Sequence, residues 1–188
     1  VDLAGDIRSL SAQDEEQIGE GAAAVVMKRY EDAIRDGDRI YSVVKGLGAA
    51  SSKNKDLDKS YKQSITRSLD DANVELDSIG LIEMCANRTT DNQIGETESI
   101  RDLLKDRAND IPCAIASVKG DIAYSGAASA LASIVKTSLC LHHRVLPSFR
   151  KFSGSDSITE QNQNFFAPAE TQSWLRDRCI GSRRALVN

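Results

Sequence analysis

Apolar residues gather into short continuous runs along the chain, and amphipathic stretches separate these runs. Runs of four to eight apolar residues are typical of strands that are buried on both faces of a parallel sheet. Turn-forming residues such as Asp36-Gly37-Asp38 bound several of them. We therefore expect strands over residues 22–27, 40–44, 79–84, 113–118 and 183–187, the last of them cut off at the chain end.

The stretches between these runs have helical periodicity. Residues 57–74 place Leu57, Tyr61, Ile65 and Leu69 on one face, which predicts an amphipathic helix. Residues 126–141 are small and apolar nearly all round, which indicates a helix that is buried on most faces. Shorter helices are expected over residues 28–35 and 97–108, a surface loop over 49–55, and irregular structure over 150–172.

Strands that alternate with helices of ten to eighteen residues imply a layered α/β fold with a largely parallel sheet. The length of 188 residues fits one domain, and 40% hydrophobic residues suffice for a core. Helices as apolar as the one over 126–141 belong between two layers and not on a surface. We therefore expect the chain to be part of a larger unit, a view that its lack of an initiator Met also favours.

Charge and hydropathy exclude several classes of partner. The formal net charge is −4, and the lysines and arginines are scattered, which argues against nucleic acid as a main partner. No apolar run approaches the roughly 18 residues of a membrane span, and the first residues lack the features of a signal peptide. The sequence therefore predicts a cytoplasmic protein.

The four cysteines are Cys85, Cys113, Cys140 and Cys179, and no two have the CxxC spacing of a zinc or redox site. Three lie in apolar surroundings, which is typical of reduced, buried thiols. We expect neither a metal nor a disulfide framework, and no organic cofactor.

Few residues could carry catalysis by themselves. The two histidines, His142 and His143, are adjacent and point about 100° apart on a helix, which favours packing at the helix end. The Glu96/Glu98 and Asp70/Asp71 pairs have the pattern of solvated charges on a helix face. Lys119 follows an apolar strand and could serve a buried site or extend its ammonium group into water.

Several segments resemble the second half of a ketoacyl synthase, a condensing enzyme. Residues 19–41 (GEGAAAVVMKRYEDAIRDGDRIY) are similar to the family segment GEGAAAVVLKRLEDAxRDGDxIYA, and residues 117–128 (SVKGDIAYSGAA) to SVKSNIGHTxGAA. Residues 82–85 (IEMC) stand where the family has VEAHGTGT, and residues 141–147 (LHHRVLP) resemble LxLRHGVLPP. The matches follow the family order from about residue 14 to residue 147, with a weaker tail over 174–188.

The resemblance also shows where this chain departs from the family. A working ketoacyl synthase uses a nucleophilic Cys in its first half and two His in its second half, which promote decarboxylation of the malonyl unit. Here Cys85 occupies the first His position and Tyr124 the second, whereas Lys119 matches the family's lysine. A thiol and a neutral phenol have neither the protonation range nor the reach of imidazole. We therefore expect no complete catalytic site in this chain.

The resemblance implies a thiolase-like layered αβαβα fold, with residues 1–188 forming a partial domain. That domain would lack both the nucleophile half and the final Gly-rich turn. The two replaced histidines are typical of a chain-length factor of a polyunsaturated fatty acid or polyketide synthase. Such a subunit pairs with an active ketosynthase as a heterodimer, shapes the tunnel for the acyl chain and works with acyl carrier protein. The alternatives are an active β-ketoacyl-[acyl-carrier-protein] synthase and a domain that only scaffolds.

Overall fold

Four parallel strands form the centre of the fold in the order β4-β2-β1-β6. They are β4 (Phe165–Phe166), β2 (Cys113–Ala116), β1 (Ile79–Glu83) and β6 (Arg184–Val187). A separate antiparallel pair joins β3 (Val145–Leu146) to β5 (Gln172–Ser173). The computed structural model describes residues 19–51, 57–84, 90–105, 107, 111–150, 164–176, 179 and 181–188.

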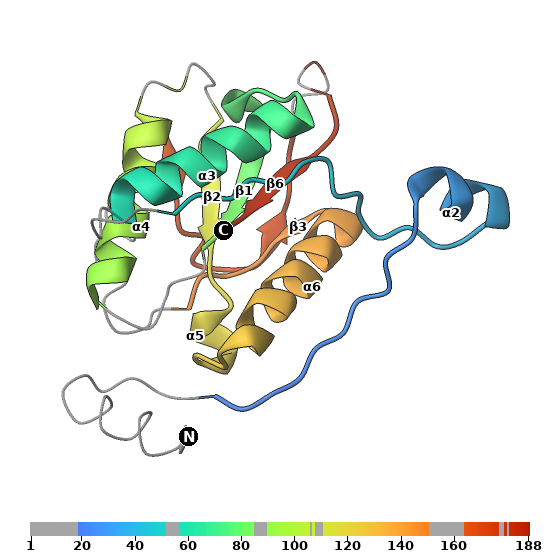
Figure 1. The fold of residues 1–188 in the computed structure, drawn as a ribbon, viewed down its shortest axis with the longest axis horizontal. Coiled ribbons are helices and arrows are strands. Elements are labelled where there is room, and N and C mark those ends of the chain that lie inside the picture. The colour runs from blue at the N-terminus through green and yellow to red at the C-terminus, as the bar shows by residue number, and fades with distance from the viewer. Residues whose placement is uncertain are drawn as a thin grey trace.

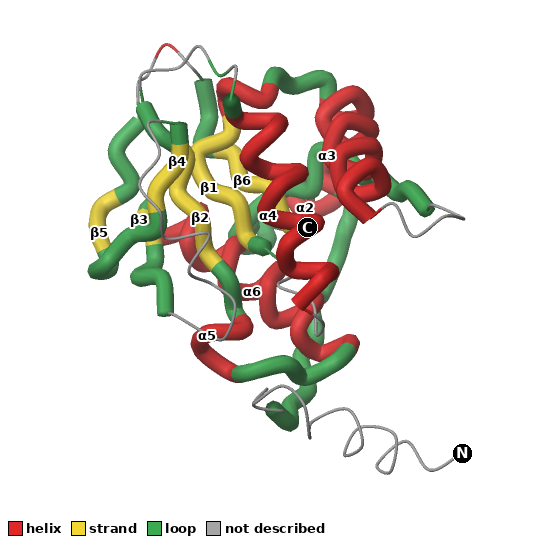
Figure 2. Tube along the Cα trace, turned by 90° about the vertical axis from the view of Figure 1, so that its left-hand side faces the viewer, coloured by secondary structure: helices red, strands yellow, loops and turns green. Residues whose placement is uncertain are grey.

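Helices cover both faces of this sheet (Figures 1 and 2). The helices α3 (Leu57–Ala72) and α4 (Thr90–Leu104) pack on one face, and α6 (Ala127–His143) packs on the other. The remaining elements are α2 (Tyr30–Asp36), the short α5 (Lys119–Ile122) and one 3-10 turn, η1 (Leu76–Ser78). The described residues thus form an α/β/α sandwich, as the alternation of runs and helices predicts.

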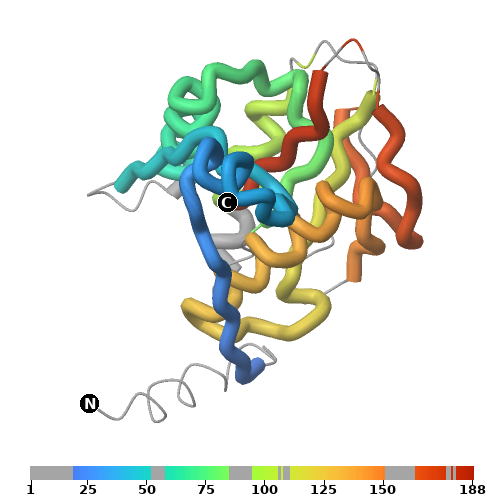
Figure 3. Tube along the Cα trace, turned by 90° about the vertical axis from the view of Figure 1, so that its right-hand side faces the viewer, coloured from blue at the N-terminus to red at the C-terminus, as the bar shows by residue number. Residues whose placement is uncertain are grey.

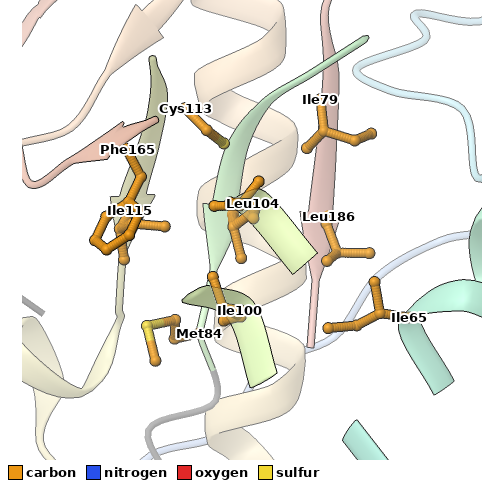
Figure 4. Close-up of a cluster of buried hydrophobic side chains, with 10 residues drawn as sticks. Ile65, Ile79, Met84, Ile100, Leu104, Cys113, Ile115, Phe165 and Leu186 are labelled. Carbon is orange, nitrogen blue, oxygen red and sulfur yellow. The ribbon is translucent and has the colours of Figure 1, made fainter. Parts of the chain in front are cut away.

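The face under α3 and α4 holds the larger apolar core (Figure 4). Leu104 and Ile100 of α4 meet Ile115 of β2 and Leu186 of β6 there, and Ile65 closes the cluster from α3. These side chains alternate with those of the opposite face, because successive residues of a strand point to opposite sides of a sheet. The continuous apolar runs of β1 and β2 are therefore explained by burial on both faces.

The face under α6 is built from smaller residues. Ala114 and Ala116 of β2 lie there beside Leu81 of β1 and Cys140 of α6. On α6 the residues that are buried against the sheet are Ser129, Ser133, Thr137 and Cys140, at a spacing of three or four. Short side chains on both elements allow the helix to approach the sheet closely, which places Glu83 of β1 directly under α6.

The positions of most elements confirm the sequence predictions. β1, β2, β6, α3 and α6 lie within two residues of their expected bounds, and α2 begins two residues later than predicted. The prediction for α4 was wrong at both ends, because the helix spans Thr90–Leu104 and not residues 97–108. Its first residues (Thr90-Asp-Asn-Gln) are all polar and give no periodic signal. The short strand β4 lies inside the stretch 150–172 that was expected to be irregular, and β5 begins at the last residue of that stretch.

The strands predicted over residues 22–27 and 40–44 are absent, and both stretches run as irregular chain. Residues 19–51 instead lie along the outside of the sandwich (Figure 3). Ser42 Oγ lies 2.8 Å from Ser138 Oγ of α6, and Gly46 and Gly48 lie against the backbone of α3. An apolar run becomes a strand only where another strand can pair with it. No such partner is present among the described residues.

The segment over residues 25–47 leaves a large apolar surface exposed. Val26 is fully exposed, and Met27 and Leu47 are 74% and 78% exposed. The prediction that α6 is buried on most faces was also wrong in part, since Ile134 and Leu139 are 38% and 41% exposed on its outer side. Exposed apolar patches of this extent mark interaction surfaces. Among the described residues, no helix is both long and apolar enough to cross a membrane.

Candidate functional site

The residues singled out from the sequence follow the carboxyl ends of two neighbouring strands. β1 and β2 are parallel and in register, with Glu83 opposite Ala116. Met84 N–H donates to the Ala116 carbonyl oxygen at 2.8 Å, so the chain stays paired one residue beyond β1. Cys85 lies outside the described residues. Met84 and Lys119 both lie at the carboxyl edge of the sheet.

Lys119 begins α5, directly after β2. It is only 5% exposed, and its backbone N–H donates to Ser117 Oγ at 3.3 Å. A lysine that extends its ammonium group into water would leave that group exposed, so the burial of Lys119 argues against this alternative. Lys119, which matches the family's lysine, is therefore buried at the carboxyl edge of the sheet.

Tyr124 follows α5 in a tight turn and is half-buried. Its carbonyl oxygen accepts a hydrogen bond from Gly19 N–H at 3.0 Å, which ties the outer segment to this turn. Gly19 is packed so closely against Ile122 and Ser125 that a side chain there would clash. Lys119 and Tyr124 thus lie at opposite ends of one short helix.

The turn before Tyr124 contains a strained backbone. Ala123 has φ 60° and ψ −172°, a region that residues with a side chain rarely adopt. In the family segment quoted above, glycine stands at this position. An alanine therefore stands here in a backbone conformation that suits glycine.

We predict that Ala123→Gly raises the free energy of unfolding by about 1 kcal/mol, because glycine removes the strain at a modest cost in chain entropy. Urea unfolding of the two chains measures the difference. Ala130→Gly is the matched control, since Ala130 lies exposed inside α6, where glycine should destabilise by about 0.5–1 kcal/mol. A loss of stability in both variants would show that the turn is not strained.

Glu83, which the sequence reasoning did not select, is the most unusual ionisable group at this edge. It is completely buried, and its Oε1 accepts hydrogen bonds from Val118 N–H and, at 3.4 Å, from Ser133 Oγ. Lys136 Nζ lies 3.5 Å from Oε2 and 2.9 Å from Asp121 Oδ2. Burial raises the pKa of Glu83 to about 7, although the positive charge of Lys136 opposes the rise. The sequence feature that could have identified Glu83 is its position as a carboxylate at the end of an otherwise apolar strand.

A second carboxylate at this edge corrects the sequence interpretation. Glu96 of α4 is completely buried and not solvated, and its Oε1 accepts from Asn188 Nδ2 at 2.7 Å. Glu98 is exposed, as expected. The backbone N–H of Asn188 donates to the Glu83 carbonyl oxygen at 3.0 Å. Asn188 therefore links the end of β1 to the middle of α4.

The other candidates lie away from this edge. His142 and His143 are exposed in the last turn of α6, where His142 packs on Tyr41 with ring centroids 4.8 Å apart. Cys113 and Cys140 are buried free thiols, Cys179 is exposed, and burial raises the pKa of Cys113 to about 12. Within the part of the chain that the structure describes, no group of three or more His, Cys, Asp or Glu could hold a metal.

The sandwich and its carboxyl edge define the class of protein. A ketosynthase from module 6 of the bacillaene synthase of Bacillus subtilis 168 superposes with a TM-score of 0.72 at 26% identity. A ketosynthase of the bacillaene polyketide synthase of Bacillus amyloliquefaciens superposes with a TM-score of 0.69 at 24% identity. Each match covers 85% of this chain and 30% of the solved structure. The fold is therefore that of part of a thiolase-like ketosynthase domain.

Residues 41–153 match the family model described as "Beta-ketoacyl synthase, C-terminal domain", and the chain belongs to this family. It is 30% identical over 180 residues to a mycocerosic acid synthase-like polyketide synthase of Mycobacterium tuberculosis. It is also 30% identical over 141 residues to a non-reducing polyketide synthase of Menisporopsis theobromae. The matches cover 90% and 72% of this chain but only 8% and 6% of these relatives. The sequence resemblance to the second half of a ketoacyl synthase is thus confirmed.

Proposed function

We propose that this chain is part of a non-catalytic, chain-length-factor type domain of a polyketide or polyunsaturated fatty acid synthase. In this role the domain pairs with an active ketosynthase and shapes the tunnel for the growing acyl chain, and the assembly works with acyl carrier protein. The observation that carries the proposal is Tyr124, which stands at the second family histidine position while the neighbouring Lys119 is retained and buried.

The chemistry of the replaced side chains supports an inactive site. Decarboxylation of a malonyl thioester leaves an enolate, whose oxygen needs a donor or a positive charge close by. An imidazole at each of the two family histidine positions supplies such a donor or positive charge near neutral pH. The phenol of Tyr124 is a neutral donor with a different reach, and the thiol of Cys85 is a weak donor. Glu83 does not replace them, because it is buried under α6 and hydrogen-bonded to the neighbouring backbone and Ser133.

The exposed apolar surface supports the proposal that the chain works inside a larger unit. Alongside the exposed residues of the outer segment, an open apolar groove follows α6, with Ala23, Val135, Leu139 and Val145 among its walls. We propose that the remainder of the ketosynthase-like domain covers both. The runs over 22–27 and 40–44 would gain partner strands there.

We predict that the full-length domain containing this chain leaves a malonyl-loaded carrier protein intact. Mass spectrometry of the carrier follows decarboxylation directly, and the domain with Tyr124→Phe serves as the control. Both proteins should show only the background rate. Decarboxylation above background that Tyr124→Phe abolishes would overturn the proposal and identify an active β-ketoacyl-[acyl-carrier-protein] synthase.

A second measurement separates a chain-length factor from a domain that only scaffolds. The partner ketosynthase is assayed with and without this domain, and the lengths of the acyl products are compared by mass spectrometry. A chain-length factor should change the distribution of lengths. If only the total yield changes and the distribution does not, the domain is a scaffold.

A further inference from the structure

A second cavity lies at the opposite edge of the sheet, where the strands begin. Its walls include Ile79 and Gly80 of β1, Pro112 just before β2, and Arg184 at the start of β6. The cavity has a volume of about 220 Å³. The candidate site described above lies at the carboxyl ends of the same strands, so the two sites are on opposite edges.

Arginines dominate the charged groups around this cavity. Arg107, Arg176, Arg183 and Arg184 line it together with one carboxylate, Asp77. Four positive charges less one negative charge leave an excess of three. Positive charges that lie close together repel each other, so an anion bound between them would be stabilised.

Two of these arginines are held in place by the backbone. Arg183 donates from Nε and Nη2 to the Trp174 carbonyl oxygen, at 3.0 and 2.8 Å. Arg107 donates from Nη2 to the carbonyl oxygens of Asp77 and Ile79, at 2.9 and 2.8 Å. Arg107 Nε and Nη1 are buried, and the Arg107 guanidinium interacts with the Cys113 thiol. The guanidinium groups are thus fixed before any ligand arrives.

Arg176 differs from these two. It is half-buried and makes no hydrogen bond or ion pair with the described part of the chain, which leaves its guanidinium available. Its charge is felt inside the cavity: the pKa of Arg183 is lowered first by partial burial and then by the positive charges of Arg176 and Arg144.

Apolar groups form the rest of the wall. Trp174 lies against β1, where a side chain at Gly80 would come within 2.9 Å of its Nε1 atom, and Leu146 and Phe166 also line the cavity. Such a wall suits the organic part of a ligand.

We propose that this cavity binds a small organic phosphate, either a phosphate monoester or a diphosphate. Guanidinium groups bind phosphate oxygens in pairs through parallel N–H donors. The excess of positive charge matches a group with two or three negative charges better than a single carboxylate. The organic part of the ligand then packs on Trp174 and its apolar neighbours.

Trp174 is the single tryptophan of the chain, so its fluorescence reports on this cavity alone. The intact chain is titrated at constant ionic strength with pyrophosphate and phenyl phosphate, and with inorganic phosphate, sulfate and benzoate as reference anions. We expect saturable fluorescence changes with the two phosphates, tighter binding of phenyl phosphate than of inorganic phosphate, and much weaker binding of benzoate.

Arg176→Gln should weaken binding of pyrophosphate about tenfold or more, because one charge-assisted pair of hydrogen bonds is lost. Arg39→Gln is the matched control, since Arg39 is exposed and does not line the cavity. It should leave the binding constant unchanged. The proposal fails if no titration saturates, if the two variants lose the same affinity, or if sulfate and benzoate bind as well as the phosphates. Unfolding midpoints of both variants show whether either has lost its fold.

Discussion

Replacing Leu104 with alanine is expected to lower the free energy of unfolding by about 2–5 kcal/mol, the range found for buried leucines. Leu104 is the last residue of α4, is fully buried, and lies at the centre of the larger core (Figure 4). This core contains residues of α4 and of all four central strands, Ile115 and Leu186 among them. Filling the cavity left by the substitution would require a strand to move, so the loss in free energy of unfolding should lie well above about 2 kcal/mol.

Leu175→Ala tests whether this loss comes from burial. The substitution is chemically the same, but Leu175 is 80% exposed, so its effect should stay within about 0.5 kcal/mol. Urea unfolding followed by circular dichroism gives both values. Equal losses in the two variants would show that the cluster around Leu104 does not form the core.

The sequence predicted the inner part of the fold well because burial there has a local signature. β1, β2 and β6 are apolar on both faces, and α3 shows clear helical spacing. The same signature led to wrong strand predictions over residues 22–27 and 40–44. An apolar run indicates that a segment is buried in the complete fold, but it does not indicate which element buries it. Whether such a run pairs as a strand depends on a neighbour, which the described part of this chain does not supply.

The sequence pointed to residues of the candidate site only where they belong to a family motif. Lys119 and Tyr124 came from the resemblance, and the structure places both around α5. Glu83 and Glu96 were missed because burial of a carboxylate depends on partners that lie far away in the sequence. Ser133 is 50 residues from Glu83, and Asn188 is 92 residues from Glu96. No local pattern could have reported these contacts.

Glu83 should make the stability of the chain depend on pH in a direction opposite to that of most carboxylates. Its pKa is about 7 in the folded chain, above the value of 4.5 for a free carboxyl. Between these two values the folded state holds a proton that the unfolded state has released. The contribution of Glu83 to stability is therefore greatest below about pH 4.5, falls as the pH rises towards 7, and then levels off. The total loss is about 3 kcal/mol, at 1.36 kcal/mol for each pH unit.

Glu83→Gln removes this titration and keeps an acceptor for Val118 N–H and for Ser133 Oγ. It also removes the ion pair with Lys136, which retains Asp121 as a partner at 2.9 Å. Relative to the original chain, the variant should therefore gain about 2.5 kcal/mol of stability between pH 5 and pH 8. Glu98→Gln controls for the loss of an exposed carboxylate on α4 and should change stability by less than about 1 kcal/mol at either pH. Urea unfolding at a series of pH values gives the comparison. A difference between Glu83→Gln and the original chain that stays constant with pH would show that Glu83 is already ionised when the chain is folded at pH 5.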